Sequence, residues 1–289
     1  MSKKDLFFIP ESIKVSELDL TVKKLTAMID HTQLNAYATS RDIKQLCDEA
    51  REYGFGAVCI NPVHVQFATT ILENSETEIC TVVGFPLGAN TSEIKAAETK
   101  LALEQGASEI DMVINLQRVR DDDWKGVAED IGTVHDELRG RGILKVILET
   151  GYLKRDQIVK ACEVSVDAGA DFVKTSTGFG VMGATYDHVK LMRESVGPNI
   201  GVKASGGIRD IKSAVSMIKA GTHRLGTSSG VEILKGFSQL DMSTTEFKYP
   251  NPCHNCPSKL VDSSKMSEST FKFYEQQCFG CPNKKFKEK

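Results

Sequence analysis

Short apolar segments alternate with longer amphipathic segments along most of the chain. The apolar segments lie at residues 27–34, 57–60, 80–85, 110–114, 145–149, 172–176, 201–205 and 224–228. Each is too short to form a helix, whereas the stretches between them, such as 91–107, have apolar residues at helical spacing and a glycine at the stop. Eight strand candidates, each followed by a helix candidate, predict a (β/α)8 barrel.

Alternation of strands and helices also fits an open, doubly wound sheet. The polar residues favour the barrel, because Asp30, Asp111, Lys174 and Lys203 all lie within or at the ends of strand candidates. A barrel directs such side chains toward one central mouth, whereas an open sheet would spread them apart. We therefore expect these four residues to meet.

Lys174 interrupts the apolar segment "DFVKTSTGFG" at residues 171–180. Burial of an unpaired ammonium group is costly, so a lone lysine here would be expected at a strand end with its head in solvent. The segment "NIGVKASGGIRD" at 199–210 repeats the arrangement with Lys203. Two lysines on consecutive strands indicate a functional site.

A lysine attacks a carbonyl only as the neutral amine, and burial or a neighbouring cation favours that form. Adjacent strands would bring Lys174 and Lys203 together, although their spacing does not decide which one is the nucleophile. Asp111 would pair with the remaining cation and move protons. A purely structural ion pair between Asp111 and Lys203 is the alternative. Taken together, the three residues favour Schiff-base chemistry.

Glycines follow the last two strand candidates. In "ASGGIRD", Gly206 and Gly207 stand directly before a predicted helix, where backbone N–H groups can bind a phosphate. The segment "GTSSG" at 226–230 follows the eighth strand candidate, and barrels commonly place an anion site after strands seven and eight. Each stretch alone is typical of an ordinary turn, but together they predict a phosphate site.

The segments "IDHTQL", "VVGFPLGANTSEIKAAE", "EIDMVINL", "DFVKTSTGFG" and "GVKASGGIRD" together resemble the deoxyribose-phosphate aldolases over roughly residues 25–235. The resemblance implies a class I aldolase that needs no cofactor. Such an enzyme cleaves 2-deoxy-D-ribose 5-phosphate to glyceraldehyde 3-phosphate and acetaldehyde, in deoxyribonucleoside catabolism. It also implies that Lys174 forms the Schiff base, that Lys203 perturbs the pKa of Lys174, and that Asp111 acts in proton transfer.

The same resemblance assigns contacts with the substrate. Asp30 and Thr177 match positions near the sugar hydroxyls. The phosphate contacts carry over to Gly178, Gly206, Gly207, Ser228 and Ser229, with Arg209 as an addition.

Three further positions lie near these motifs and have different expected roles. Phe179 stands where some relatives have a lysine, so a cationic phosphate contact is absent there. Cys59 matches a pocket cysteine of some relatives, although a small core residue is the simpler interpretation. His31 is expected to be a hydrogen-bonded structural residue.

Composition limits the remaining function classes. The formal net charge of -3 gives no reason to expect nucleic acid or a membrane surface as a partner. No apolar run approaches the roughly 18 residues that a membrane span requires. Cys47, Cys59, Cys80 and Cys162 are scattered without extracellular disulfide spacing, which favours a reducing, cytoplasmic location. A homo-oligomer is left open.

The C-terminal residues do not fit the barrel pattern. Cys253, Cys256, Cys278 and Cys281 form two C-x2-C pairs, and two such pairs can offer four thiolates to one structural zinc ion. Redox disulfides and an iron-sulfur cluster are the alternatives. We therefore divide the chain into an N-terminal extension (1–24), an aldolase barrel (25–248) and a four-cysteine module (249–289). Relatives often carry a terminal tyrosine near the site, and the sequence does not decide whether Tyr249 or Tyr274 takes its place.

Two other functions compete with this aldolase. One is a related Schiff-base aldolase for another phosphorylated sugar, since a few pocket contacts decide which substrate is accepted. The other is a barrel scaffold that presents the zinc module to a partner. The joint presence of Lys174, Lys203 and Asp111 favours an enzyme over a scaffold.

Overall fold

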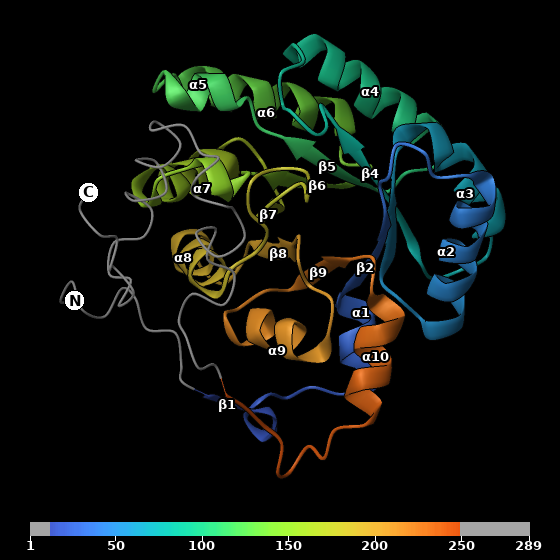
Figure 1. Ribbon diagram of the computed structural model, residues 1–289. Coiled ribbons are helices and arrows are strands. Elements are labelled where there is room, and N and C mark those ends of the chain that lie inside the picture. The colour runs from blue at the N-terminus through green and yellow to red at the C-terminus, as the bar shows by residue number, and fades with distance from the viewer. Residues whose placement is uncertain (1–11, 249–289) are drawn as a thin grey trace, which may run out of the picture.

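Eight parallel strands form a closed barrel in the computed structural model, which describes residues 12–248 (Figure 1). In barrel order they are β2 (Ile29–Gln33), β3 (Ala57–Ile60), β4 (Glu78–Val83), β5 (Glu109–Val113), β6 (Ile143–Ile147), β7 (Phe172–Lys174), β8 (Gly201–Ser205) and β9 (Arg224–Thr227). β9 pairs with β2 and closes the ring. The predicted (β/α)8 barrel is thus confirmed, and the open sheet is excluded.

Helices surround the barrel and link its strands (Figure 1). They are α1 (Val22–Met28), α2 (Ser40–Tyr53), α3 (Val65–Ile71), α4 (Ser92–Glu104), α5 (Leu116–Arg120), α6 (Trp124–Leu138), α7 (Arg155–Asp167), α8 (Tyr186–Val196), α9 (Ile211–Lys219) and α10 (Gly230–Ser238), with short 3-10 turns at Val15–Glu17, Pro62–His64 and Thr150–Tyr152. α2 illustrates their local signals. Thr39 and Asp42 form a capping box at its start, and Gly54 ends it in the left-handed conformation.

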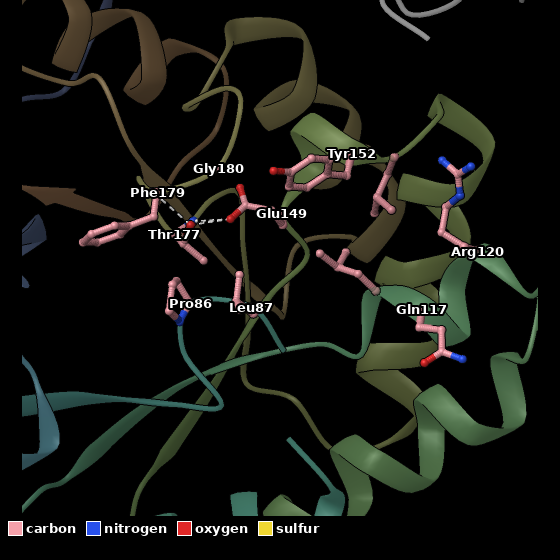
Figure 2. Close-up of a pocket in the computed structure, with 11 residues that line it drawn as sticks. Pro86, Leu87, Gln117, Arg120, Glu149, Tyr152, Thr177, Phe179 and Gly180 are labelled. Carbon is pink, nitrogen blue, oxygen red and sulfur yellow. Dashed lines mark hydrogen bonds between the residues drawn. The ribbon is translucent and has the colours of Figure 1, made fainter. Parts of the chain in front are cut away.

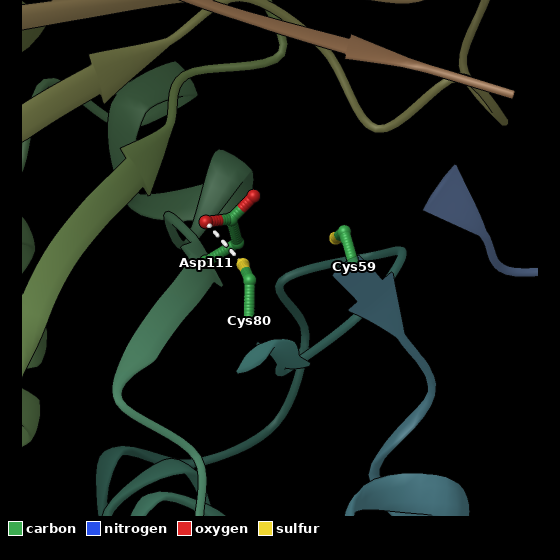
Figure 3. A group of neighbouring side chains, drawn as sticks. All are labelled: Cys59, Cys80 and Asp111. Atoms are coloured by element: carbon green, nitrogen blue, oxygen red, sulfur yellow. Dashed lines mark hydrogen bonds between the residues drawn. The ribbon is translucent and has the colours of Figure 1, made fainter. Parts of the chain in front are cut away.

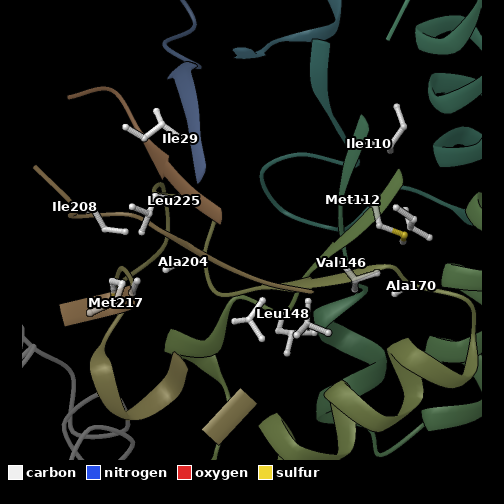
Figure 4. Close-up of a cluster of buried hydrophobic side chains, with 14 of the residues drawn as sticks. Ile29, Ile110, Met112, Val146, Leu148, Ala170, Ala204, Ile208, Met217 and Leu225 are labelled. Atoms are coloured by element: carbon white, nitrogen blue, oxygen red, sulfur yellow. The ribbon is translucent and has the colours of Figure 1, made fainter. Parts of the chain in front are cut away.

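Strand β5 alternates between an apolar outer face and a charged inner face. On β5, Ile110 and Met112 belong to the hydrophobic cluster between barrel and helices, which Figure 4 shows. Glu109 and Asp111, at the intervening positions, meet Lys145 of β6. Because successive side chains of a strand point to opposite faces, one apolar layer stabilises the fold while the inner face remains available for charged groups.

The two ends of the described chain pair with each other. β1 (Ser12–Lys14) and β10 (Glu246–Lys248) form a small antiparallel sheet, with Ser12 opposite Lys248. Ile13 is buried against Val215 of α9, so this sheet is attached to the barrel wall. The sequence analysis did not predict this pairing. The predicted zinc ligands of the C-terminal module, together with Tyr249 and Tyr274, lie outside the described residues, so the boundary at 249 stays a prediction.

Within residues 12–248, none of the helices is both long and apolar enough to cross a membrane.

Candidate active site

Lys174 is the last residue of β7 and is buried, with 2% of its surface exposed. Its Nζ lies 2.6 Å from Oδ2 of Asp111, which β5 supplies. The ammonium head therefore lies inside the protein. The head of a lone lysine at a strand end would instead lie in solvent. The predicted contact between a strand lysine and Asp111 is present.

Lys203 lies beside Lys174, because the two residues are paired across β7 and β8. Its Nζ is 2.7 Å from the same Asp111 Oδ2, and it also forms an ion pair with Asp30 of β2. Burial by itself would lower the pKa of Lys203, but the carboxylates of Asp111 and Asp30 outweigh burial and raise it above the ordinary value. Lys203 is therefore a firmly protonated cation.

Asp111 connects the two lysines to a third. Its Oδ1 lies 2.9 Å from Nζ of Lys145 on β6. Burial would raise the pKa of Asp111, but the ammonium groups of Lys145, Lys174 and Lys203 hold it well below its usual range. This carboxyl is an anion over the whole neutral pH range.

The sequence analysis missed a second set of charges in the barrel interior. Lys145 Nζ lies 2.5 Å from Glu109 Oε2 and 3.6 Å from Asp30 Oδ2. Arg224, at the start of β9, contacts Asp30 Oδ1 through Nε at 2.6 Å and Glu109 through Nη2 at 3.0 Å. Two of these residues could have been identified from the sequence. Lys145 is a lysine within an apolar strand candidate, and Glu109 precedes Asp111 by two residues and therefore lies on the same face of the strand.

The charges of this interior do not balance. Among the described residues, the network contains four basic side chains (Lys145, Lys174, Lys203 and Arg224) and three carboxylates (Asp30, Glu109 and Asp111). Lys174 has one carboxylate contact, whereas the other three bases have two or three. The network therefore contains one more basic side chain than carboxylates, and Lys174 is the base with the fewest counter-charges.

Asp30 is fully buried within this network, and cations engage both of its oxygens. Burial would raise the pKa of Asp30, but Lys203, Lys145 and Arg224 lower it below its usual range. The contact of Asp30 with a sugar hydroxyl stays a prediction.

The loops after β7, β8 and β9 meet at the carboxyl end of the barrel. Ser205 Oγ donates to Ser176 O at 2.6 Å, which joins the first two loops. Thr227 Oγ1 donates to Ile208 O at 2.6 Å, which joins the second and third loops. Because these hydrogen bonds hold the three loops together, the predicted phosphate residues are gathered at one rim.

Backbone geometry in these loops suits a close approach by an anion. Gly178, Gly206 and Gly207 have φ angles of 88°, 87° and 80°, which favour glycine. A Cβ on Gly206 would lie 3.7 Å from Gly178 Cα, so these two turns are in contact. Arg209 and Ser228 are exposed, and Ser229 directly precedes α10. The loops that carry the predicted phosphate residues therefore lie together, and binding of a phosphate by these residues stays a prediction.

Comparisons with known proteins agree with this geometry. Residues 24–236 match the DeoC/LacD family aldolase model. The deoxyribose-phosphate aldolase of Geobacillus sp. (strain WCH70) is 54% identical over 212 residues, which are 73% of this chain and 95% of that protein. The Clostridium tetani enzyme of the same name is 51% identical over 73% of this chain and 98% of its own. The chain belongs to the DeoC/LacD aldolase family.

Solved structures give the same result. A putative deoxyribose-phosphate aldolase from Coccidioides immitis is 41% identical, with a TM-score of 0.74 over 82% of this chain and 94% of that one. The Aeropyrum pernix deoxyribose phosphate aldolase, described as a unique tetramer, is 32% identical with a TM-score of 0.74 over 83% and 99% of the two chains. The four C-terminal cysteines lie beyond the segment that matches the family model.

A cavity of about 340 Å³ lies among the loops that follow β4, β6 and β7 of this aldolase (Figure 2). Thr177 lines it, together with residues of α5 and of the loops after β4 and β6. The backbone N–H of Thr177 donates to Glu149 Oε2 at 3.1 Å, and its hydroxyl donates to the same oxygen. Glu149 thus lies beneath the loop that carries Thr177 and Gly178.

Glu149 is a further residue that the sequence analysis missed. It follows β6 with a φ of 52°, and its Oε1 is buried without a hydrogen-bond partner. Burial raises the pKa of Glu149 above its usual value. Its only sequence signal is an acid at the carboxyl end of a barrel strand, a position that commonly serves the active site.

Two other positions have clear roles in packing. His31 Nε2 lies 2.7 Å from Glu49 Oε2 and the His31 ring packs on Phe55, in agreement with the predicted structural role. Phe179 is exposed and makes an edge-to-face contact with Phe85, with ring centroids 5.4 Å apart. No cationic group therefore occupies position 179, as the sequence analysis expected.

Proposed function

We propose that this aldolase cleaves 2-deoxy-D-ribose 5-phosphate through a Schiff base on Lys174. The charge imbalance of the barrel interior carries this proposal. The network contains one more basic side chain than carboxylates, and Lys174 is the base with the fewest carboxylate contacts. Lys203 is held as a cation next to it and disfavours a second ammonium group. The spacing of the residues left the choice between the two lysines open, and these contacts favour Lys174 as the nucleophile.

In the reaction, the neutral Lys174 amine attacks the C1 carbonyl of the open-chain sugar, and loss of water gives an iminium ion. The iminium withdraws the electron pair of the C2–C3 bond as that bond breaks, while the C3 hydroxyl loses its proton. This step releases glyceraldehyde 3-phosphate and leaves an enamine on Lys174. Protonation at C2 and hydrolysis of the resulting iminium then release acetaldehyde and the free amine. The steps require protein side chains and water, with no cofactor.

Asp111 is placed to move these protons, since its Oδ2 lies within 2.7 Å of both Lys174 Nζ and Lys203 Nζ. With Lys203 it would relay a proton through water to the carbinolamine and the enamine. Lys145 and Asp30 would act as positioning residues, because they hold Asp111 and Lys203 in place.

The glycine turns at 178 and 206–207, the serines at 228–229 and Arg209 would bind the 5-phosphate. Support comes from the joined loops and from the exposed backbone of Gly207 ahead of α9. Thr177, which Glu149 holds, would contact a sugar hydroxyl. The deoxyribose-phosphate aldolases at 51–54% identity act on the substrate class that this arrangement fits.

A related aldolase for another phosphorylated sugar is the remaining rival. A panel of phosphorylated sugars, assayed for the carbonyl products that each one releases, separates the two functions. We expect 2-deoxy-D-ribose 5-phosphate to give the highest kcat/KM. A higher value for a sugar phosphate whose cleavage releases a different carbonyl product would reject the proposed substrate.

For the C-terminal module, we propose a structural zinc site at Cys253, Cys256, Cys278 and Cys281. The proposal rests on the two C-x2-C pairs alone, since these cysteines lie outside the described residues. Elemental analysis of reductively purified protein should find about one zinc per chain. No zinc, with four additional free thiols, would reject it.

Location and assembly stay predictions. A cytoplasmic location fits the scattered cysteines, and a homo-oligomer would parallel the tetramer named for the Aeropyrum pernix relative. Size-exclusion chromatography with light scattering would measure the assembly state directly.

A further inference from the structure

Two cysteines are paired across neighbouring strands inside the barrel. Cys59 of β3 lies directly opposite Cys80 of β4 in the parallel register, and both are fully buried. Their Sγ atoms lie within 4.8 Å of each other and of an Asp111 carboxylate oxygen (Figure 3). Paired positions on adjacent strands are about 4.8 Å apart, which is within the Cα separation that a disulfide can bridge.

The surroundings give the two sulfur atoms different properties. A hydrogen bond from Cys80 lowers the pKa of Cys59 to about 7, against the effect of burial and with help from the Lys203 ammonium. Burial raises the pKa of Cys80 well above the ordinary value. A thiol with a lowered pKa next to a second thiol is the arrangement in which an oxidised sulfur can be captured by its neighbour.

A metal ion is the other ligand that two thiols and a carboxylate could accept. Lys145 already occupies the position of such a cation, because its Nζ lies 3.2 Å from Cys80 Sγ and 2.9 Å from Asp111 Oδ1. Lys174 and Lys203 add further positive charge at Asp111. These ammonium groups oppose a metal ion but stabilise a thiolate, so the site favours oxidation over metal binding.

We propose that Cys59 and Cys80 form a reversible disulfide that switches off the aldolase, with hydrogen peroxide as the oxidant. The Cys59 thiolate attacks one peroxide oxygen, the O–O bond breaks, and a sulfenic acid and hydroxide form. Cys80 sulfur then attacks the Cys59 sulfur and displaces the hydroxyl group, while the Cys80 proton leaves in water. Overall, two thiols and one peroxide give one disulfide and two waters. A dithiol reductant reverses the change.

The interior must be reachable for this reaction. Cys59, Cys80 and the catalytic lysines face the same barrel interior, since Lys145 and Asp111 contact Cys80. The substrate carbonyl must reach Lys174 in this interior, and hydrogen peroxide is smaller than that substrate.

Formation of the disulfide would remove a contact of Asp111, the proposed proton-transfer carboxylate. Cys80 Sγ lies 3.1 Å from Asp111 Oδ1 and 3.2 Å from Lys145 Nζ, and a bond to Cys59 requires it to move toward β3. Asp111 and Lys145 would lose this partner, and Asp111 is the group that holds Lys174 and Lys203. The effect on activity rests on the proposed role of Asp111, whereas formation of the disulfide does not.

The experiment treats the full-length, reduced protein with hydrogen peroxide and follows two readouts. Peptide mapping without reductant should reveal a cross-linked pair of peptides that contain residues 59 and 80. Acetaldehyde release should fall at least tenfold, in proportion to the cross-linked fraction, and dithiothreitol should restore most of it. Mapping is needed because the chain has four further cysteines in its C-terminal module. Absence of the cross-link after oxidation would overturn the proposal.

Matched variants separate the disulfide from other oxidation. Cys80→Ala should abolish the cross-link together with the reversible loss of activity, each protein being compared with its own untreated sample. Cys162→Ala removes a buried thiol on the outer helix α7 and should retain both effects. Equal, dithiothreitol-reversible inactivation of Cys80→Ala would show that a sulfenic acid on Cys59 is sufficient and would overturn the disulfide. A complete cross-link with unchanged activity would leave the aldolase assignment intact but overturn the switch.

Discussion

Within residues 12–248, lysine side chains are buried in two places, and the surroundings differ in one decisive respect. Between the outer helices, Lys95 of α4 is fully buried with its Nζ 2.5 Å from Asp130 Oδ2 of α6 and 2.9 Å from Val113 O. Ser92 donates to the other oxygen of Asp130. This site has one cation, one carboxylate and hydrogen bonds for both partners.

The barrel interior instead holds four bases and three carboxylates. The balanced pair serves the packing of α4 against α6, although burial lowers the pKa of Lys95 in spite of the Asp130 carboxylate. In the barrel interior, Lys174 has fewer carboxylate contacts than the other bases, and we propose that it supplies the neutral amine that chemistry at a carbonyl requires. Burial alone therefore does not distinguish the proposed nucleophile from a structural lysine, whereas the surrounding charges do.

The largest effect should come from removal of the proposed nucleophile. Lys174→Leu should lower kcat/KM for 2-deoxy-D-ribose 5-phosphate by at least roughly 10⁴-fold, because no other amine can form the covalent intermediate. Its Tm should stay close to that of the wild type, since Asp111 keeps its ion pairs with Lys145 and Lys203. Steady-state assays and thermal unfolding measure both quantities. A variant with a tenth or more of the wild-type activity would reject Lys174 as nucleophile.

Substitution of Lys95, in the balanced pair with Asp130, should lower stability and leave activity unchanged. Lys95→Met leaves the buried carboxylate of Asp130 unpaired and should reduce the free energy of unfolding by about 3–5 kcal/mol. The activity of each folded molecule should be unchanged, because Lys95 contacts Asp130 and the Val113 carbonyl rather than the charged side chains inside the barrel. Urea unfolding of Lys95→Met and of the double variant Lys95→Met/Asp130→Leu tests the cause. The double variant should recover most of the loss, and a failure to recover would point to packing rather than charge.

His188 offers a third case, a buried titratable group with a neutral partner. Its Nδ1 lies 3.0 Å from Thr150 Oγ1, and burial lowers its pKa from 6.5 to about 4. The unfolded state thus binds a proton between pH 6.5 and 4 that the folded state does not. This contribution to stability is fully present above pH 6.5 and is lost as the pH falls toward 4, by roughly 3 kcal/mol in total.

The matched variant His188→Gln does not titrate in this range. Denaturant unfolding of both proteins from pH 7 to 4 should give a flatter stability profile for the variant. Parallel profiles for the two proteins would show that His188 titrates alike in the folded and unfolded states.

The smallest of these effects should occur at the rim, where the proposed phosphate contacts are exposed. Deoxyribose without its phosphate should have a kcat/KM lower by about 10²-fold, equivalent to roughly 2.7 kcal/mol. Arg209→Ala should raise KM for the phosphorylated sugar several-fold and leave the unphosphorylated sugar unaffected. Equal kcat/KM values for the two sugars would contradict the phosphate site.

The sequence predicted the barrel well because short apolar strands and capped helices are local signals. It also placed Lys174, Lys203 and Asp111 together, since each lies at a strand position that a barrel directs inward. The charge imbalance could not be predicted from the sequence, because it depends on which residues of all eight strands face the barrel interior. Arg224 begins its strand, where an exposed base is ordinary. The pairing of β1 with β10 joins segments more than 200 residues apart, and nothing local indicates it.

Covalent trapping tests most directly whether Lys174 is the reactive amine of the barrel interior. Borohydride reduction in the presence of 2-deoxy-D-ribose 5-phosphate traps a Schiff base, and peptide mapping locates the modified lysine. The account predicts one adduct per chain, on Lys174, with Lys95, Lys145 and Lys203 unmodified. An adduct on Lys203 or Lys145, or the absence of any adduct while acetaldehyde is released, would contradict it.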